Sequence, residues 1–478
     1  MSSTSSVPTP VRISARIGPP SFSGRIARFG RFLLPFHQRA PRTPPSLRRP
    51  STVLHASCTM SAIDDQRSTM SDQRTPWHTD QWFTSPWNHD SDVAADLRFP
   101  QRVEFHDVTL RDGEQQAGVE FSADDKLRIA EALADAGVQR IEAGLPAVSA
   151  EDEKAVRRIT AAGLPSTIYA FSRCMLDDVK RAVDCGVAGV VLEVPSSRHL
   201  IELGYRWSVE RAVELSVSAT RYAHEQGLSV SFFPIDATRA SLEDYLALVG
   251  QVADEGHMDA LVLVDTFGVL APQAVPTFVS QSRERFDVPL ETHFHMDYGL
   301  GVANTLIAAA NGAATLQTTL AALGERAGNT PMEETVMALR TLYDVDCGID
   351  TTKLTAISRL VCDLAGVEQP PNRPVTGSRL FDVESGIIAT WVRNVRDVDV
   401  TECVPYDPRM VGQDLPSVVL GKGSGLDNVA EYLERLDLTA TEDQQAELLK
   451  AVKSASLAKR DLLTEEEFGE LAESVGIR

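Results

Sequence analysis

The sequence predicts an α/β protein whose main domain is a (β/α)8 barrel of the TIM type. From Val103 onward, short apolar runs with β-forming residues alternate with amphipathic segments of helical length. Eight such units fill about 240 residues, close to the ~250 residues that this barrel requires. An open doubly wound sheet is the alternative, but no glycine-rich phosphate loop follows the first run.

The expected strands and helices can be placed in order along the chain. The eight strand-like runs begin at Val103, Val138, Ser166, Val187, Leu228, Asp259, Pro289 and Gly312. Helical segments between them begin at Ala123, Ser149 and Asn304, and others follow the barrel in GLDNVAEYLERL and LTEEEFGELAESVG. The last barrel helix is expected to end near Asp344.

Composition indicates a globular protein that acts on small molecules. The chain of 478 residues is 43% hydrophobic and 24% charged, and its net charge of -21 opposes binding to nucleic acid or to an anionic membrane. The six cysteines show no C-x-x-C spacing, which favours a reducing compartment. No apolar run reaches the ~18 residues of a membrane span.

Four regions are expected. Residues 1–70 form a disordered leader, because the first 63 contain nine Arg and no Lys, Asp or Glu. This leader is either a transit peptide, which implies an organellar matrix, or sequence upstream of a true start at Met60 or Met70, which implies a cytoplasmic protein. Residues 71–100 are an N-terminal extension, 101–346 the barrel, and 347–478 a small, mostly helical α+β accessory subdomain.

Two histidines mark the end of the seventh expected strand. In ETHFHMDYGLGVAN, which begins at Glu291, His293 and His295 are two residues apart, so their side chains project to the same side. Barrel active sites are built at the carboxyl ends of the strands. An isolated H-x-H is more simply a structural pair, but this position favours a functional one.

Polar residues from two other strand ends are expected to meet these histidines. TLRDGEQ places Arg111 and Asp112 after the first strand, and LGERAGN places Glu325, Arg326 and Asn329 after the eighth. Closing the barrel makes strand eight the neighbour of strands one and seven, so the three segments converge at one rim.

The converging groups are typical of an open divalent metal site. Two imidazoles, a carboxylate and an amide oxygen suit Mg, Mn or Zn. Such a metal would chelate a 2-oxo acid or β-hydroxy acid and polarise its carbonyl. Arg111 would provide positive charge for a carboxylate or a developing oxyanion. The alternative is a surface ion pair between Arg111 and Asp112.

Several motifs in the same order resemble the family of homocitrate synthases and 2-isopropylmalate synthases. They are LRDGEQ, then Lys126 after ten residues, L-x-x-H-x-H-x-D-x-G from Leu290, and GERAGN. The segment VGQDLPSVVLGKGSGLDNV, from Val411, resembles the post-barrel subdomain of the same family. Citramalate synthases and, more distantly, hydroxymethylglutaryl-CoA lyases share this metal-dependent barrel.

The resemblance implies roles for individual residues. The divalent metal would be held by Asp112, His293, His295 and Asn329. Arg111 would be the activating cation, and Glu142 an acidic residue that is either catalytic or a support for its loop. The implied substrate contacts are Gln115, His199, Thr266 and Glu325.

The implied reaction is a Claisen-type condensation. The enolate of an acyl-CoA, with acetyl-CoA as the expected donor, would attack a metal-bound 2-oxo acid. Thioester hydrolysis would then release a 2-hydroxy-2-alkyl dicarboxylate. The resemblance also implies a homodimer in which the accessory segment reaches the partner's barrel.

The chain departs from the family pattern where a proton must be moved. The usual F-x-P-E-D-A-x-R reads FFPIDATR, and Val383, Ile388 and Gly423 stand where histidines are expected. No histidine follows His295, so the accessory segment cannot supply the histidine base of the family. Tyr406 is the predicted substitute, with Asp382 and Glu384 as alternatives; a lone carboxylate would need burial to serve.

Two other hypotheses stay open. One is a carbon–carbon lyase of the hydroxymethylglutaryl-CoA lyase type, although the glycine-rich cysteine loop of those enzymes is not visible near LGERAGN. The other is a non-catalytic metal-binding relative. Retention of the basic, acidic, histidine and amide residues of the predicted site argues against it, because a scaffold needs none of them.

Overall fold

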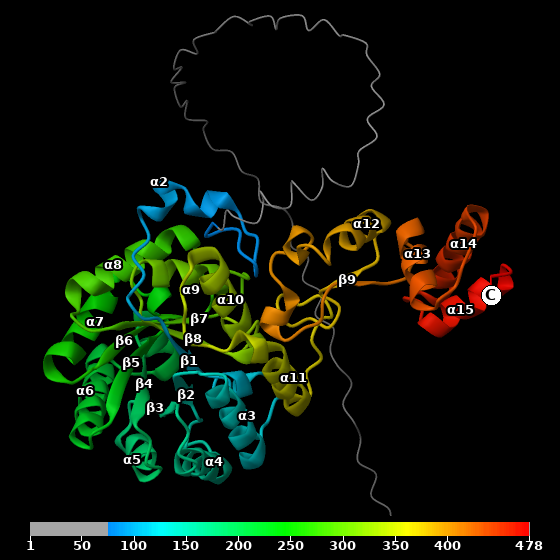
Figure 1. Ribbon diagram of the computed structural model, residues 1–478. Coiled ribbons are helices and arrows are strands. Elements are labelled where there is room, and N and C mark those ends of the chain that lie inside the picture. Colours follow the sequence, from blue (N-terminus) through cyan, green and yellow to red (C-terminus); the bar gives the residue numbers. More distant parts are fainter. Residues whose placement is uncertain (1–74, 478) are drawn as a thin grey trace, which may run out of the picture. The chain divides into compact units, whose positions relative to one another are not determined.

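A computed structural model describes residues 75–477, and in them the predicted closed barrel is confirmed. The predicted leader lies outside the described residues. Eight parallel strands pair in chain order, and β8 closes the barrel on β1 (Figure 1). They are β1 (Glu104–Asp107), β2 (Arg140–Glu142), β3 (Thr167–Arg173), β4 (Gly189–Pro195), β5 (Ser229–Ile235), β6 (Ala260–Asp265), β7 (Leu290–Phe294) and β8 (Thr315–Thr318).

A helix follows each strand. These helices are α3 (Ala123–Asp135), α4 (Ala150–Ala161), α5 (Leu176–Asp184), α6 (Val209–Glu225), α7 (Leu242–Glu255), α8 (Val275–Arg285), α9 (Gly301–Ala310) and α10 (Met332–Tyr343). Serine side chains accept backbone N–H bonds at the starts of α3, α4, α6 and α7, which satisfies donors that the first turn leaves unpaired. The helix expected from Asn304 begins three residues earlier, at Gly301.

Alternation along each strand separates two cores. In β7, Leu290 and Phe294 belong to the large core between strands and helices, whereas Glu291 and His293 face the barrel interior. A second apolar cluster fills part of that interior, formed by Tyr169, Phe171, Val191, Phe233, Val262 and Val264. This alternation of side chains along β7 explains why His293 points into the barrel.

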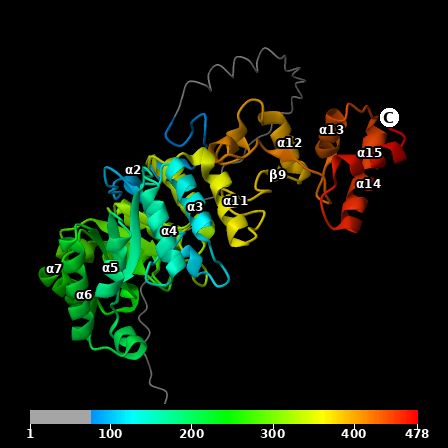
Figure 2. The same cartoon turned by 90° about the horizontal axis from the view of Figure 1, so that it is seen from below.

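The chain after the barrel is small and mostly helical, as predicted. α11 (Leu354–Ala365) packs against α3, and a short parallel pair, β9 (Asp382–Val383) with β10 (Ser417–Val418), flanks α12 (Gly386–Val395). Figure 2 shows the last three helices side by side, and they share a separate apolar core: α13 (Leu426–Arg435), α14 (Glu442–Lys459) and α15 (Glu465–Ser474). The sequence reading missed α14, whose fully buried apolar residues are only Leu448 and Val452.

Before the barrel lie a 3-10 turn, η1 (Pro86–His89), and the short helix α2 (Ser91–Ala94). Within residues 75–477, no helix has the length and apolar character needed to cross a bilayer.

Replacing Phe468 by Ala should selectively destabilise the three-helix unit. Phe468 is fully buried and its ring packs 5.3 Å from that of Tyr432. Truncating a buried Phe costs about 3–5 kcal/mol. Hydrogen exchange should therefore accelerate in α13–α15 and stay slow in the barrel strands. Leu457→Ala, at an exposed position of α14, is the matched control and should change little.

Candidate active site

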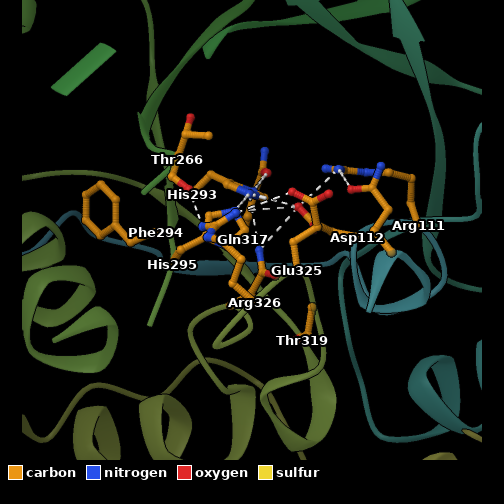
Figure 3. A network of polar contacts seen from close by, with 12 residues as sticks. Arg111, Asp112, Thr266, His293, Phe294, His295, Gln317, Thr319, Glu325 and Arg326 are labelled. Atoms are coloured by element: carbon orange, nitrogen blue, oxygen red, sulfur yellow. Dashed lines mark hydrogen bonds and ion pairs between the residues drawn. The ribbon is translucent and has the colours of Figure 1, made fainter. Parts of the chain in front are cut away.

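Three buried side chains converge at the carboxyl ends of β1 and β7 (Figure 3). Asp112 Oδ2 lies 3.0 Å from His293 Nε2 and 4.0 Å from His295 Nε2. The two Nε2 atoms are 3.3 Å apart. Asp112, His293 and His295 thus form a candidate metal site, in agreement with the predicted convergence.

The protonation of these groups fits a divalent cation. His293 Nδ1 lies 2.8 Å from Gln317 Oε1, which can only accept a hydrogen bond, so a neutral His293 carries its lone pair on Nε2. Burial lowers the pKa of His295 to about 4, which leaves that ring neutral at pH 7. Burial disfavours the charge of Asp112, but Arg111 and His293 outweigh burial and hold the pKa of Asp112 well below its usual range.

Unpaired atoms also point to a bound cation. The two Nε2 atoms and the Asp112 carboxylate face one another, an arrangement that a cation between them would stabilise. Asp112 Oδ1 and Asn329 Oδ1 are buried without hydrogen-bond partners among the described residues. Asn329 Nδ2 lies 3.1 Å from His293 Nε2 and 3.3 Å from Asp112 Oδ2. A half-turn of this amide would present Oδ1 to the cluster as the predicted fourth ligand.

A buried polar column continues from His293 down the barrel interior. Gln317 Nε2 donates to Glu291 Oε2 at 3.0 Å, and Arg140 Nη1 donates to Glu291 Oε1 at 2.8 Å. Ser231 Oγ also donates to Glu291, at 3.0 Å. These partners fix the ring orientation of His293. The sequence analysis missed them, although alternation in TLQT places Gln317 on the same inner face.

Arg111 is held rigidly beside the metal cluster. It forms an ion pair with Glu142, and its Nη1 donates to Asp112 Oδ2 at 3.0 Å and to Gln115 Oε1 at 3.4 Å. Its guanidinium lies 4.0 Å from the centre of the Phe171 ring. The alternative of a surface ion pair is wrong, because Arg111 and Asp112 are both buried. The Nη2 group has no partner among the described residues, so it is available to a ligand.

The rim above β6 and β8 carries other predicted contacts. Arg326 binds Asp297 through Nε and Nη2, each at 2.9 Å, and its Nη2 donates to the Thr266 carbonyl at 2.6 Å. Glu325 is exposed and pairs with Arg326 at 3.3 Å. Thr266 is half-buried, and its Oγ1 accepts the Asp236 N–H at 2.8 Å. Glu325 is therefore the most solvated of the predicted substrate contacts at this rim.

Two further predicted residues lie apart from this cluster. His199 follows β4 and its Nε2 lies 3.0 Å from Asp236 Oδ2, at the end of the neighbouring strand β5. Tyr406 packs edge-on against Phe381, with ring centres 6.1 Å apart. Burial raises the pKa of Tyr406 to about 12, so its hydroxyl is protonated at neutral pH. Its predicted role as a base stays a prediction that this pKa disfavours.

Comparison with known proteins shows the family of this chain. The family model described as HMGL-like matches residues 102–361. The chain belongs to this family. A homocitrate synthase AksA of Methanopyrus kandleri is 38% identical over 385 residues, which cover 80% of this chain and 95% of that protein. Homocitrate synthase 1 of a Nostoc species is 35% identical over 367 residues, 77% of this chain and 96% of that one.

Two further comparisons concern another synthase and a solved structure. A probable 2-isopropylmalate synthase of Methanopyrus kandleri is 37% identical over 354 residues, 74% of this chain and 70% of that protein. The hydroxymethylglutaryl-CoA lyase of Bacillus subtilis shares the fold, with a TM-score of 0.52 and 19% identity over 57% of this chain and 97% of that one. The predicted family is confirmed, and with it the prediction of an enzyme of the acyltransferase type.

His293→Ala should remove bound divalent metal without unfolding the barrel. The substitution removes one of the nitrogens at the candidate metal site. It leaves intact Leu290 and Phe294, the β7 residues that belong to the large core. Metal content after dialysis, measured by elemental analysis, should fall to background while circular dichroism is unchanged. His224→Ala, which changes a histidine stacked on His257 away from the carboxyl ends of the strands, should keep its metal. Undiminished metal in the His293 variant would contradict the assignment.

Gln317→Met should weaken metal binding while preserving side-chain volume. Loss of a hydrogen-bonding partner behind a metal-binding histidine typically costs about 10–100-fold in affinity. Competition titration with a chelating dye measures the dissociation constant. Thr315→Val, two residues earlier on the same inner face of β8, should leave that constant unchanged.

Proposed function

We propose that the chain is a divalent-metal-dependent acyltransferase that condenses an acyl-CoA, preferably acetyl-CoA, with a 2-oxo acid. The product would be a 2-hydroxy-2-alkyl dicarboxylate. The observation that carries this proposal is one buried carboxylate, Asp112, shared by two imidazoles and the Arg111 guanidinium. The names of its relatives, homocitrate synthase and 2-isopropylmalate synthase, support the same chemistry.

Arg111 is the main electrostatic group of the proposed mechanism. A divalent metal, when held by Asp112, His293, His295 and Asn329, supplies a Lewis acid for the 2-oxo carbonyl. The free Nη2 of Arg111 would donate to the oxygen on which negative charge develops. Because Glu142 and Phe171 fix the guanidinium, little reorganisation is needed as the reaction proceeds.

The remaining predicted contacts would orient the 2-oxo acid. The Thr266 hydroxyl accepts the Asp236 N–H, so its own proton is free to donate to the substrate carboxylate. Gln115 lies beside Arg111 with its amide N–H groups available for the same carboxylate. Glu325 would contact the more solvated part of the substrates. The apolar rings of Phe171 and Phe233 would exclude water from the reacting carbons.

A cytoplasmic homodimer is the assembly that we propose. Its support is an apolar face of α12, where Ile387 and Trp391 lie one turn apart and expose 71% and 53% of their surface. An apolar pair of this kind favours burial against another surface.

The proposed function is tested by thiol release from metal-loaded protein. A panel of acyl-CoAs is crossed with 2-oxo acids, and products are identified by mass spectrometry. Thiol release that requires both substrates, with a product mass equal to acyl group plus oxo acid plus water, would support condensation. Cleavage of hydroxyacyl-CoA thioesters without condensation would favour a lyase, and inactivity with retained metal would favour a non-catalytic relative.

Arg111→Ala should lower kcat by about 10²–10³-fold, the usual effect of removing one preorganised oxyanion donor. Metal content should remain, because Arg111 is not a ligand. Steady-state thiol release and elemental analysis measure the two quantities. Arg128→Ala, on the exposed face of α3, serves as the control and should retain full turnover. Near-normal turnover of the Arg111 variant would contradict its proposed role.

A further inference from the structure

The proposed condensation needs a base. The accessory subdomain contains no histidine that could serve as one. Removing a proton from the acyl methyl requires a side chain whose lone pair is free to accept a proton near neutral pH. No histidine follows His295 in the chain, and the Tyr406 hydroxyl is protonated at neutral pH. A histidine base must therefore come from the chain up to His295.

His199 is the histidine that meets this need. Among residues 75–477, the other histidines at the carboxyl ends of barrel strands are His293 and His295 of the metal cluster. His199 precedes the π-helical turn η3 (Leu200–Tyr205), and 48% of its side chain is exposed. Turns of this type are frequent at functional sites. Its ring is thus open to a substrate at the barrel mouth.

A buried carboxylate orients the His199 ring. Asp236 Oδ2 lies 3.0 Å from His199 Nε2, and because a carboxylate accepts, Nε2 must carry the proton. The lone pair of a neutral ring is then on Nδ1, which has no hydrogen bond within the described chain. This is the arrangement of a general base whose tautomer is set by an acid.

Asp236 is itself held from several sides. Arg239 donates to its two oxygens at 2.5 and 3.0 Å, Ser197 Oγ donates to Oδ2, and its backbone N–H binds Thr266. The side chain is fully buried and the backbone is left-handed, with φ of 63°. The other charged groups next to His199 are Arg198, Glu202 and Asp244, which pair with one another.

The pair faces the metal cluster from the other side of the barrel. His199 and Asp236 follow β4 and β5, whereas the metal cluster follows β1, β7 and β8. Phe233, three residues before Asp236, reaches inward to within 4.7 Å of the His293 ring and 5.9 Å of the Arg111 guanidinium. Phe233 thus links the strand that leads to Asp236 with the candidate metal cluster.

We propose that His199 is the general base of the condensation and that Asp236 is its positioning residue; this rests on the proposed function. The methyl C–H bond breaks, its proton passes to Nδ1 of His199, and its electron pair becomes the enolate. The enolate carbon then bonds to the 2-oxo carbon, whose carbonyl electron pair moves to oxygen. The imidazolium releases its proton to solvent, and the alkoxide takes a proton from solvent.

The test compares proton removal with binding. His199→Gln should lower kcat by about 10²–10⁴-fold, the usual contribution of a general base. Metal content and the KM of the 2-oxo acid should change little. With trideuterated acetyl-CoA, the isotope effect on kcat should rise, because C–H cleavage becomes rate-limiting. His199→Ala should regain activity on addition of imidazole, which a structural role would not explain.

Asp236→Asn tests the positioning residue without straining the backbone, because Asn tolerates the left-handed region. It should lower kcat and raise the isotope effect in the same direction. His257→Gln is the matched control: His257 Nε2 lies 3.0 Å from Asp259 Oδ1, but this pair sits at the amino end of β6, on the opposite face of the barrel. Its turnover should equal that of the wild type.

The outcomes separate the two proposals. If the wild type releases no thiol with any substrate pair, the proposed function fails. If the wild type condenses but His199→Gln keeps its turnover and isotope effect, the base assignment is overturned. A rise in KM with no imidazole rescue would also overturn it and leave His199 as the substrate contact that the family resemblance implies.

Discussion

The pairing of β8 with β1 is the constraint on which the site depends. Its register places Asp107 opposite Thr318, and so brings the segments after both strands to one rim. Asp112 and Asn329 are 217 residues apart in sequence, yet their side chains are within 3.3 Å. Without closure, a carboxylate from the first strand end could not meet imidazoles from the seventh. The barrel is thus a device for bringing distant polar groups together in a buried place.

Burial makes the charges of the site depend on one another. A buried ion without a partner is costly, so each charged group here is paired or poised for a ligand. Arg111 is balanced by Glu142 and Asp112, and Asp112 also faces the imidazoles. Among the unpaired atoms, Asp112 Oδ1 and Asn329 Oδ1 are acceptors that a metal would satisfy, and Arg111 Nη2 is a donor that an anionic substrate would satisfy. The same compensation explains why Gln317 and Glu291 extend beneath His293.

The departures from the family pattern fall on residues expected to manage proton removal, while the residues expected to hold a metal are retained. His199 and Asp236 offer a route by which such a chain could retain its chemistry. Strand β4 supplies the imidazole and strand β5 the acid, so the pair depends on the same parallel pairing that builds the barrel. With the base after β4 and the metal site across the barrel, the acyl-CoA would lie nearer the base and the 2-oxo acid nearer the metal.

The sequence by itself determined the order and number of the barrel strands and named the residues of the candidate metal cluster. Period-two alternation puts His293 on the inner side of its strand, and barrel closure predicts its meeting with Asp112. Only the tertiary structure decided which partner each polar group takes: Gln317 behind His293, Glu142 against Arg111, and Asp236 against His199. These pairings depend on strand register and stagger, which local propensity does not encode. For the same reason, the sequence could name Tyr406 and Glu325 but could not foresee that one would be half-buried with its ring against Phe381 and the other left to solvent.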